Sequence, residues 1–217
     1  MVLFLIFSIP VAVVLYLKLV FSGYFDGGQI WPPFFRGLAS FAISALPIYL
    51  IIELYPVFYT QNALYVRFFI IDFLVFCAGA LLFFFIWERR KIHVSYGKPL
   101  FVEIAAFFSG YIALAGILYA VVHSYDMDAY RLFAFPILLL LLFWIASVLV
   151  YLFQIAGDWK GYFWIAALLV PALLYSVVPF FHLTSHIFYC WLSSVLLIGL
   201  SAALALLVSR KHFLPGL

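Results

Sequence analysis

Seven apolar stretches, each about as long as a membrane-crossing helix, dominate this chain of 217 residues. A helix that crosses the hydrocarbon core of a bilayer needs about 20 predominantly apolar residues. Turn-forming sequences such as Asp26-Gly27-Gly28 and Pro32-Pro33 separate the stretches. The pattern predicts an all-α integral membrane protein whose residues 1–217 form a single polytopic domain. The seven helices are expected near residues 2–22, 38–57, 65–87, 99–121, 132–155, 162–180 and 185–208.

The composition agrees with a bilayer as the solvent. Hydrophobic residues make up 70% of the chain and charged residues 9%, against about 45–50% and about 25% in soluble domains. A soluble fold of this size needs a polar shell that these residues cannot supply. Soluble enzymes, nucleic-acid-binding domains and disordered chains are therefore excluded. We expect membrane lipids as partners, with a membrane-protein partner or a second copy as a further possibility, and an integral membrane location (the cytoplasmic or inner membrane in a bacterium).

Two places leave the helix count open. The link between the sixth and seventh stretches, at residues 181–184, is short, so six spans with one re-entrant pair are the alternative. Residues 1–10 carry no charge and Lys18 lies at the far end of the first stretch, whereas a signal peptide begins with a positive region. We therefore expect a retained first helix. Cys77 and Cys190 lie inside apolar stretches and are expected to be buried thiols rather than a disulfide.

The basic residues orient the seven helices. Lys and Arg concentrate in the cytoplasmic loops of membrane proteins. With seven spans, Arg67 and Arg131 fall on one side, and the other nine basic residues fall on the opposite side. The sequence therefore predicts an N-terminus outside and a C-terminus in the cytoplasm. The nine cytoplasmic residues are Lys18, Arg36, Arg89, Arg90, Lys91, Lys98, Lys160, Arg210 and Lys211.

Prolines indicate an internal repeat. Pro47 and Pro171 lie 124 residues apart, and Pro56 and Pro179 lie 123 residues apart. Helices one to three would then recur in parallel as helices five to seven, with the fourth helix as a linker (3+1+3). This plan resembles the seven-helix superfamily of the SWEET sugar carriers, the KDEL receptor and the microbial rhodopsins. The resemblance implies architecture alone, because the last stretch has no interior lysine that could hold retinal.

Ionisable residues inside a membrane are energetically costly, so they are functional candidates by default. The predicted topology gathers most of them in the outer half of the protein. We expect a small-solute carrier or a ligand-binding seven-helix protein whose substrate contacts Asp72, Glu53, Arg67 and His123. The alternative role for Asp72 is a structural hydrogen bond or ion pair between helices. An enzyme is the less favoured class, and no cofactor is required by this interpretation.

Two histidines at the last hairpin favour a second hypothesis. His182 and His186 are four residues apart, and on one helix face this spacing can chelate Zn²⁺ with a third ligand such as Asp72. The pattern resembles the alkaline-ceramidase-like membrane hydrolases, whose metal site uses two histidines of the last helix and an aspartate of the third. The resemblance implies a zinc-dependent intramembrane lipid hydrolase with His182, His186 and Asp72 as ligands. The serine and histidine that this family carries near the end of helix 2 are absent from residues 47–59.

Three further interpretations remain open. Two histidines on facing helices can ligate haem iron, and His123 with His182 or His186 is the candidate pair. The histidines of the last hairpin could instead bond to water or to lipid headgroups at the membrane interface. The whole chain could be a non-catalytic subunit of a larger membrane complex, which needs only apolar faces and few buried charges.

Overall fold

The computed structural model describes residues 2–21, 27–54, 60–92, 98–122 and 160–209, together with five positions between 140 and 147. These residues are helical or belong to the turns that connect helices, so the all-α class is confirmed. The helices are α1 (Val2–Phe21), a 3-10 turn η1 (Gly27–Ile30), α2 (Trp31–Leu54), α3 (Gln61–Arg67), a π-helical segment η2 (Phe68–Val75), α4 (Phe76–Ile92), α5 (Lys98–Val122), α7 (Lys160–Leu183) and α8 (Ile187–Ser209).

Helix α2 begins earlier than the expected start at residue 38. Its first residue is Trp31, so Pro32 and Pro33 lie in its first turn rather than in a loop. Proline is tolerated there because the first-turn N–H groups have no partner within the helix. The loop prediction for these two prolines was therefore wrong. At the start of α3, the Thr60 side chain accepts a hydrogen bond from the Ala63 N–H at 3.3 Å and caps the helix.

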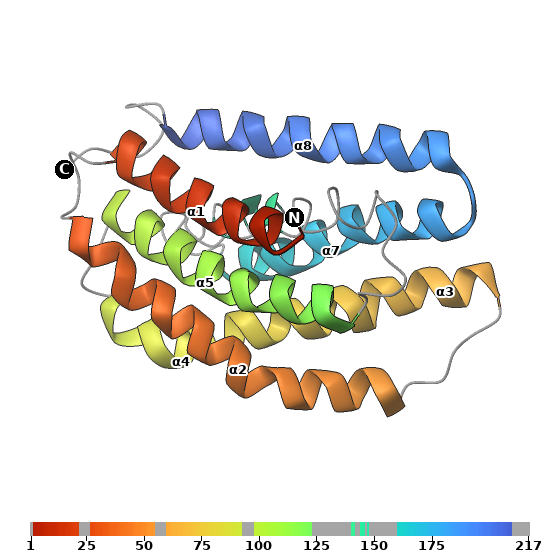
Figure 1. Cartoon of the computed structure of the whole chain (residues 1–217), viewed down its shortest axis with the longest axis horizontal. Helices are drawn as coiled ribbons and strands as arrows, with labels where there is room; N and C mark the ends of the chain where they lie inside the picture. Colours follow the sequence, from red (N-terminus) through yellow and green to blue (C-terminus); the bar gives the residue numbers. More distant parts are fainter. Residues whose placement is uncertain are drawn as a thin grey trace.

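The helices form a bundle along its long axis (Figure 1). Helices α2, α5 and α7 run in one direction, whereas α1, α8 and the continuous stretch from α3 through η2 to α4 run in the opposite direction. Toward one end, on the right of the figure, lie the last turn of α2, the start of α3 and the hairpin between α7 and α8. We call this the hairpin end. At the opposite end, which we call the basic end, the Lys18 ammonium lies 5.6 Å from the centre of the Trp31 ring. Lys18 closes α1 and Trp31 opens α2, so a cation–π contact joins the two helices there.

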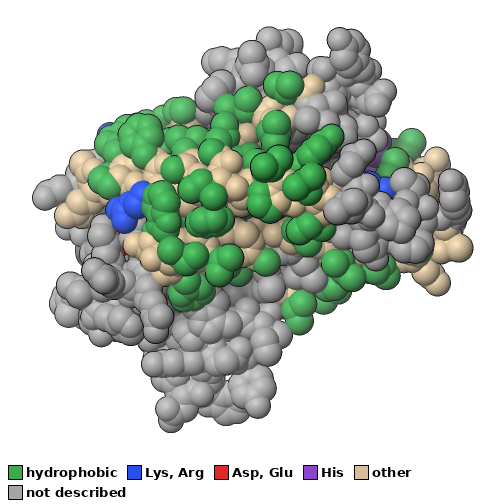
Figure 2. Space-filling model, turned by 90° about the horizontal axis from the view of Figure 1, so that it is seen from below, with side chains coloured by type: hydrophobic (Ala, Val, Ile, Leu, Met, Phe, Trp, Pro, Cys, Tyr) green, Lys and Arg blue, Asp and Glu red, His purple; other side chains and the backbone are tan. Residues whose placement is uncertain are grey.

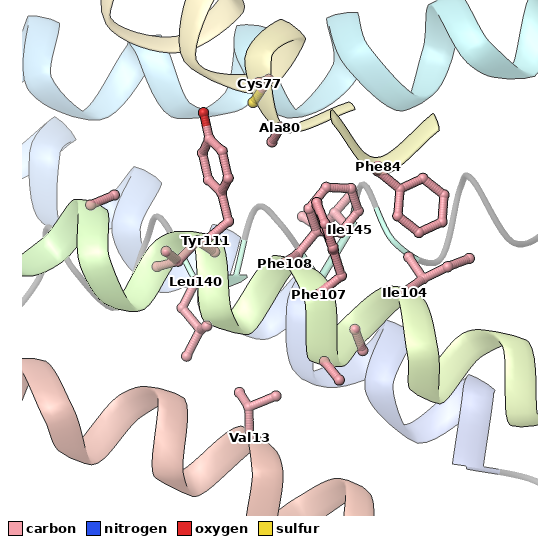
Figure 3. Close-up of a cluster of buried hydrophobic side chains, with 14 of the residues drawn as sticks. Val13, Cys77, Ala80, Phe84, Ile104, Phe107, Phe108, Tyr111, Leu140 and Ile145 are labelled. Carbon is pink, nitrogen blue, oxygen red and sulfur yellow. The ribbon is translucent and has the colours of Figure 1, made fainter. Parts of the chain in front are cut away.

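Helix α5 is the most enclosed of the long apolar helices. In its segment Leu100–Leu118, 83% of the residues are buried, against 22% in the corresponding segments of α2 and α8. Figure 3 shows its Phe107 and Phe108 beside Phe84 of α4, with the rings of Phe84 and Phe107 5.4 Å apart in an edge arrangement. Three small residues of α5 at four-residue spacing, Ala105, Ser109 and Ala113, are also buried, so this face of α5 packs inside the chain.

Helices α2 and α5 approach each other through two reciprocal glycines. A Cβ built on Gly37 would collide with the backbone carbonyl of Phe107, and a Cβ built on Gly110 would collide with that of Phe34. Glycine at both positions lets the two backbones meet directly, as small residues do where membrane helices pack closely. We call this contact the glycine seam. It fixes α2 against the enclosed helix α5.

Much of the apolar surface faces outward. Leu19, Leu46, Phe188 and Leu196 are between 64% and 79% exposed. Figure 2 shows one face of the molecule on which most of the described side chains are hydrophobic, with Lys and Arg side chains toward its two ends. Exposed apolar surface on this scale is unusual for a soluble monomer and is compatible with a protein surrounded by lipid.

Three helices of the described part of the chain are long and apolar enough to cross a membrane: Gly28–Ile51, Leu100–Leu118 and Ile187–Leu204. Shorter apolar helices lie at Val11–Val20, Phe76–Trp87 and Leu173–Leu183. The expected fifth helix, at residues 132–155, falls largely outside the described residues. The count of seven spans and the 3+1+3 repeat therefore stay predictions.

Candidate functional site

The third apolar stretch is helical over residues 61–92, but its hydrogen bonding changes in the middle. Between α3 and α4, the eight residues of η2 adopt a π-helix. Ile70 and Ile71 are adjacent β-branched residues, which crowd an α-helical turn, so the local sequence is compatible with a wider turn. π-helical turns are rare and are frequent at functional sites. This segment contains Asp72, the carboxylate that the sequence singles out.

The η2 segment is flanked by a direct contact between α3 and α7. The Tyr65 hydroxyl donates a hydrogen bond to the Leu173 carbonyl oxygen at 3.5 Å. The Tyr65 ring also meets the Phe180 ring edge-on, with the ring centres 5.5 Å apart. Both contacts hold the beginning of the third stretch against α7. Neither contact was identified from the sequence.

The structure describes some of the residues that were expected to contact a substrate. Arg67 is the last residue of α3 and is half-buried. Asp72 lies in η2 and Glu53 in the last turn of α2, and the side chains of both fall outside what the structure describes. His123 also lies outside it. Because the end of α2 and the start of α3 belong to the hairpin end (Figure 1), the backbones of Glu53 and Arg67 lie toward the same end of the bundle.

The histidines of the last hairpin do not share a helix face. Helix α7 continues to Leu183 and α8 begins at Ile187, so His182 lies in the last turn of one helix and His186 in the turn before the next. The His186 N–H bonds to the Phe181 carbonyl at 2.9 Å and the Ser185 N–H to the His182 carbonyl at 3.2 Å. With Ser185 at a φ of 61°, these bonds form a Schellman motif that ends α7. The expected i, i+4 placement on one helix was therefore wrong.

The His186 ring is held locally. Its Nδ1 lies 3.1 Å from the Thr184 hydroxyl oxygen. The ring also lies against Phe181 and Tyr189, at centre distances of 6.3 and 6.2 Å. Among the residues that the structure describes, no group of three His, Cys, Asp or Glu side chains could hold a metal ion. The proposed third ligand, Asp72, and the haem candidate His123 are not covered by this finding.

Zinc content separates the hydrolase hypothesis from the carrier hypothesis. We expect purified protein to contain well below one zinc per chain, because the two imidazoles belong to different elements and His186 is engaged by Thr184. Elemental analysis after removal of loosely bound metal measures this. About one zinc per chain, lost in the variant His182→Ala, would instead favour the hydrolase.

Two hydroxyl groups that the sequence did not single out form a buried cluster beside η2. The Tyr111 hydroxyl of α5 lies 2.9 Å from the Ser44 hydroxyl of α2, and it lies 3.3 Å from the Phe76 carbonyl oxygen, to which it can donate. Tyr111 is completely buried and Ser44 is 5% exposed. One pattern in the sequence could have indicated this contact: Gly37, Ser40 and Ser44 are small residues spaced along one face of α2, where another helix can approach closely. We call Ser44, Tyr111 and the Phe76 carbonyl the hydroxyl cluster.

The two cysteines are free and buried, as the sequence predicted. Cys77 follows Phe76 directly, and Figure 3 shows it near the hydroxyl of Tyr111. Cys190 lies in α8. The two thiols therefore lie in different parts of the bundle.

Comparisons with protein-family models, with curated proteins and with solved structures find no match for this chain.

Proposed function

We propose that the protein is a seven-helix membrane carrier, or a ligand-binding protein of the same plan, whose small polar solute binds in the outer half of the membrane. The observation that carries the proposal is the π-helical segment Phe68–Val75 around Asp72. A carboxylate in an apolar helix is energetically costly unless it serves a function or finds a partner. Its position in a rare type of helical turn supports a functional role.

The orientation of the chain supports an outer site. The proposed topology puts nine basic residues on the cytoplasmic side and leaves Arg67 on the outer side. In this orientation, the hairpin end faces outward and the basic end faces the cytoplasm. Glu53 of α2 and Arg67 of α3 then lie toward the outer end, with Asp72 further along the same helical stretch. A site with two carboxylates and one guanidinium suits a small solute with charged or hydroxyl groups.

Helix geometry supports movement around such a site. Pro47 lies inside α2, and proline in a helix interior removes a backbone hydrogen bond and favours a bend. Substrate sites of carriers often lie where membrane helices depart from regular α-helical geometry. The π segment of the third stretch and the proline of α2 are two such departures.

Uptake by vesicles tests the proposal. The purified protein is reconstituted in liposomes and offered a panel of radiolabelled sugars, amino acids and small organic cations. We expect at least one class of solute to enter faster than into protein-free liposomes, with saturation as its concentration rises. A carrier is contradicted if no class enters faster and none shifts the thermal unfolding of the protein, since a ligand at 100 times its Kd should stabilise it by about 2.7 kcal/mol.

A further inference from the structure

The hydroxyl cluster joins three helical elements at one buried point. Tyr111 comes from α5, Ser44 from α2, and Phe76 is the first residue of α4, directly after η2. The Tyr111 ring also packs edge-on against Phe41 and Phe76, with centre distances of 5.1 and 5.2 Å. The bond from the Tyr111 hydroxyl to the Phe76 carbonyl therefore ties α5 to the junction between the π segment and α4.

The junction lies close to the tyrosine hydroxyl. A Cβ built on Gly79 would lie 3.0 Å from the Tyr111 oxygen, so the glycine leaves the space that the hydroxyl occupies. Cys77 is 4% exposed and lies at the same junction (Figure 3). Because the Tyr111 hydroxyl is buried, bulk water could not replace a hydrogen-bond partner that it lost.

The cluster has two possible arrangements of its protons. A hydroxyl group donates one hydrogen bond. In the first arrangement, Ser44 donates to Tyr111 and Tyr111 donates to the Phe76 carbonyl at 3.3 Å. In the second, Tyr111 donates to Ser44 and Ser44 donates to the Phe41 carbonyl at 3.2 Å. The bond between Tyr111 and Ser44 persists in both, but only the first holds the junction.

We propose that Tyr111 is a positioning residue: its hydroxyl holds the junction of η2 and α4, and rotation of the two hydroxyls releases the segment that carries Asp72. The inference rests on the proposed function in one respect, namely that the position of Asp72 matters for solute binding. The release itself is independent of any solute. It exchanges the Phe76 carbonyl for the Phe41 carbonyl as an acceptor, so the two hydroxyls donate the same number of hydrogen bonds in both arrangements.

Cysteine labelling tests the release without a solute. The protein in lipid nanodiscs is treated with N-ethylmaleimide, and the labelling of Cys77 and of Cys190 is followed by mass spectrometry. In the variant Tyr111→Phe, which keeps the packed ring and removes the hydroxyl, we expect Cys77 to react about tenfold faster, the factor that corresponds to one net hydrogen bond. Cys190, in α8, is expected to keep its wild-type rate.

The variant Ser44→Ala separates positioning from packing. It removes the alternative partner of Tyr111, so the tyrosine can donate only to the Phe76 carbonyl within the cluster. Cys77 should then react no faster than in the wild type. Loss of packing alone would expose Cys77 in both variants, which overturns the proposal. The proposal is equally overturned if Tyr111→Phe leaves the Cys77 rate unchanged, or if it exposes Cys77 and Cys190 together.

A second readout separates this inference from the proposed function. For the solute that the uptake panel identifies, Tyr111→Phe should raise KM while Ser44→Ala leaves KM unchanged. If Asp72→Asn transports normally but Tyr111→Phe exposes Cys77 selectively, the proposed solute site at Asp72 is wrong, whereas the proposed release of the junction is supported. If Asp72→Asn abolishes uptake while Cys77 stays protected in Tyr111→Phe, the proposed solute site at Asp72 is supported, whereas the positioning role of Tyr111 is wrong.

Discussion

Replacing Gly37 or Gly110 by alanine is expected to destabilise the protein by about 3 kcal/mol, the upper part of the range for overpacked cores. At either position the new methyl group would collide with a backbone carbonyl of the facing helix. A side chain could rotate away, but a helical carbonyl cannot move without its helix. The glycine seam must therefore open along α2 and α5, and the burial of α5 decreases with it.

Gly199→Ala is the matched control for the glycine seam. Gly199 lies in α8, and a Cβ built there would meet nothing within 4 Å. The helix propensity of alanine exceeds that of glycine by about 1 kcal/mol, so this variant should be as stable as the wild type or slightly more stable. Thermal unfolding in one detergent, followed by circular dichroism, compares the three variants. The seam has no structural role if Gly37→Ala and Gly199→Ala melt at the same temperature.

The double variant gives a further check on the same contact. Gly37 and Gly110 belong to one seam, and substitutions at sites in contact are usually not additive. Once the first alanine has separated α2 from α5, the second meets less resistance. The double variant should therefore lose less stability than the sum of the two single losses.

The sequence predicted helix bounds well where the length and apolarity of a stretch determine where the helix begins and ends. The stretches expected near 2–22 and 99–121 correspond to α1 (Val2–Phe21) and α5 (Lys98–Val122). These features depend on local composition, which a single sequence contains.

Features that depend on a partner or on a rare backbone conformation could not be predicted. Gly37 and Gly110 are ordinary glycines until α2 and α5 are known to face each other. The left-handed conformation of Ser185 divides the last hairpin and separates His182 from His186, yet glycine is the usual residue at this position. The π-helical turn at Asp72 lacks a sequence signature that would distinguish it from an α-helix.

The candidate site was predictable only in outline. The scarcity of charge in the apolar stretches pointed to Asp72, Glu53 and Arg67, because each is costly in a membrane. The hydroxyl cluster was missed, since serine and tyrosine are common in membrane helices and neither carries a charge. Its importance emerges only from the distances that join Tyr111 to Ser44 and to Phe76.

Asp72→Asn is expected to weaken solute uptake by about 10- to 100-fold, the range that corresponds to the loss of a hydrogen bond to a charged group. The amide keeps the size of the side chain and can still form hydrogen bonds, so the bundle should fold normally. Only the negative charge is lost. An effect on uptake without an effect on unfolding temperature would therefore identify a role in solute binding.

Glu103→Gln is the matched control for this substitution. Glu103 is a half-buried carboxylate of α5, which begins at Lys98 in the basic end of the bundle. It undergoes the same chemical change at a position away from the proposed site. Uptake by this variant should equal that of the wild type, whereas a general sensitivity to lost carboxylates would reduce uptake by both variants equally.

The most direct test is the uptake of the solute found in the vesicle panel, measured side by side for wild type, Asp72→Asn and Glu103→Gln in liposomes that contain equal amounts of folded protein. A carrier with its site at the π-helical segment predicts uptake reduced by about 10- to 100-fold for Asp72→Asn and wild-type uptake for Glu103→Gln. Wild-type uptake by Asp72→Asn would contradict the assignment of the solute site to this segment.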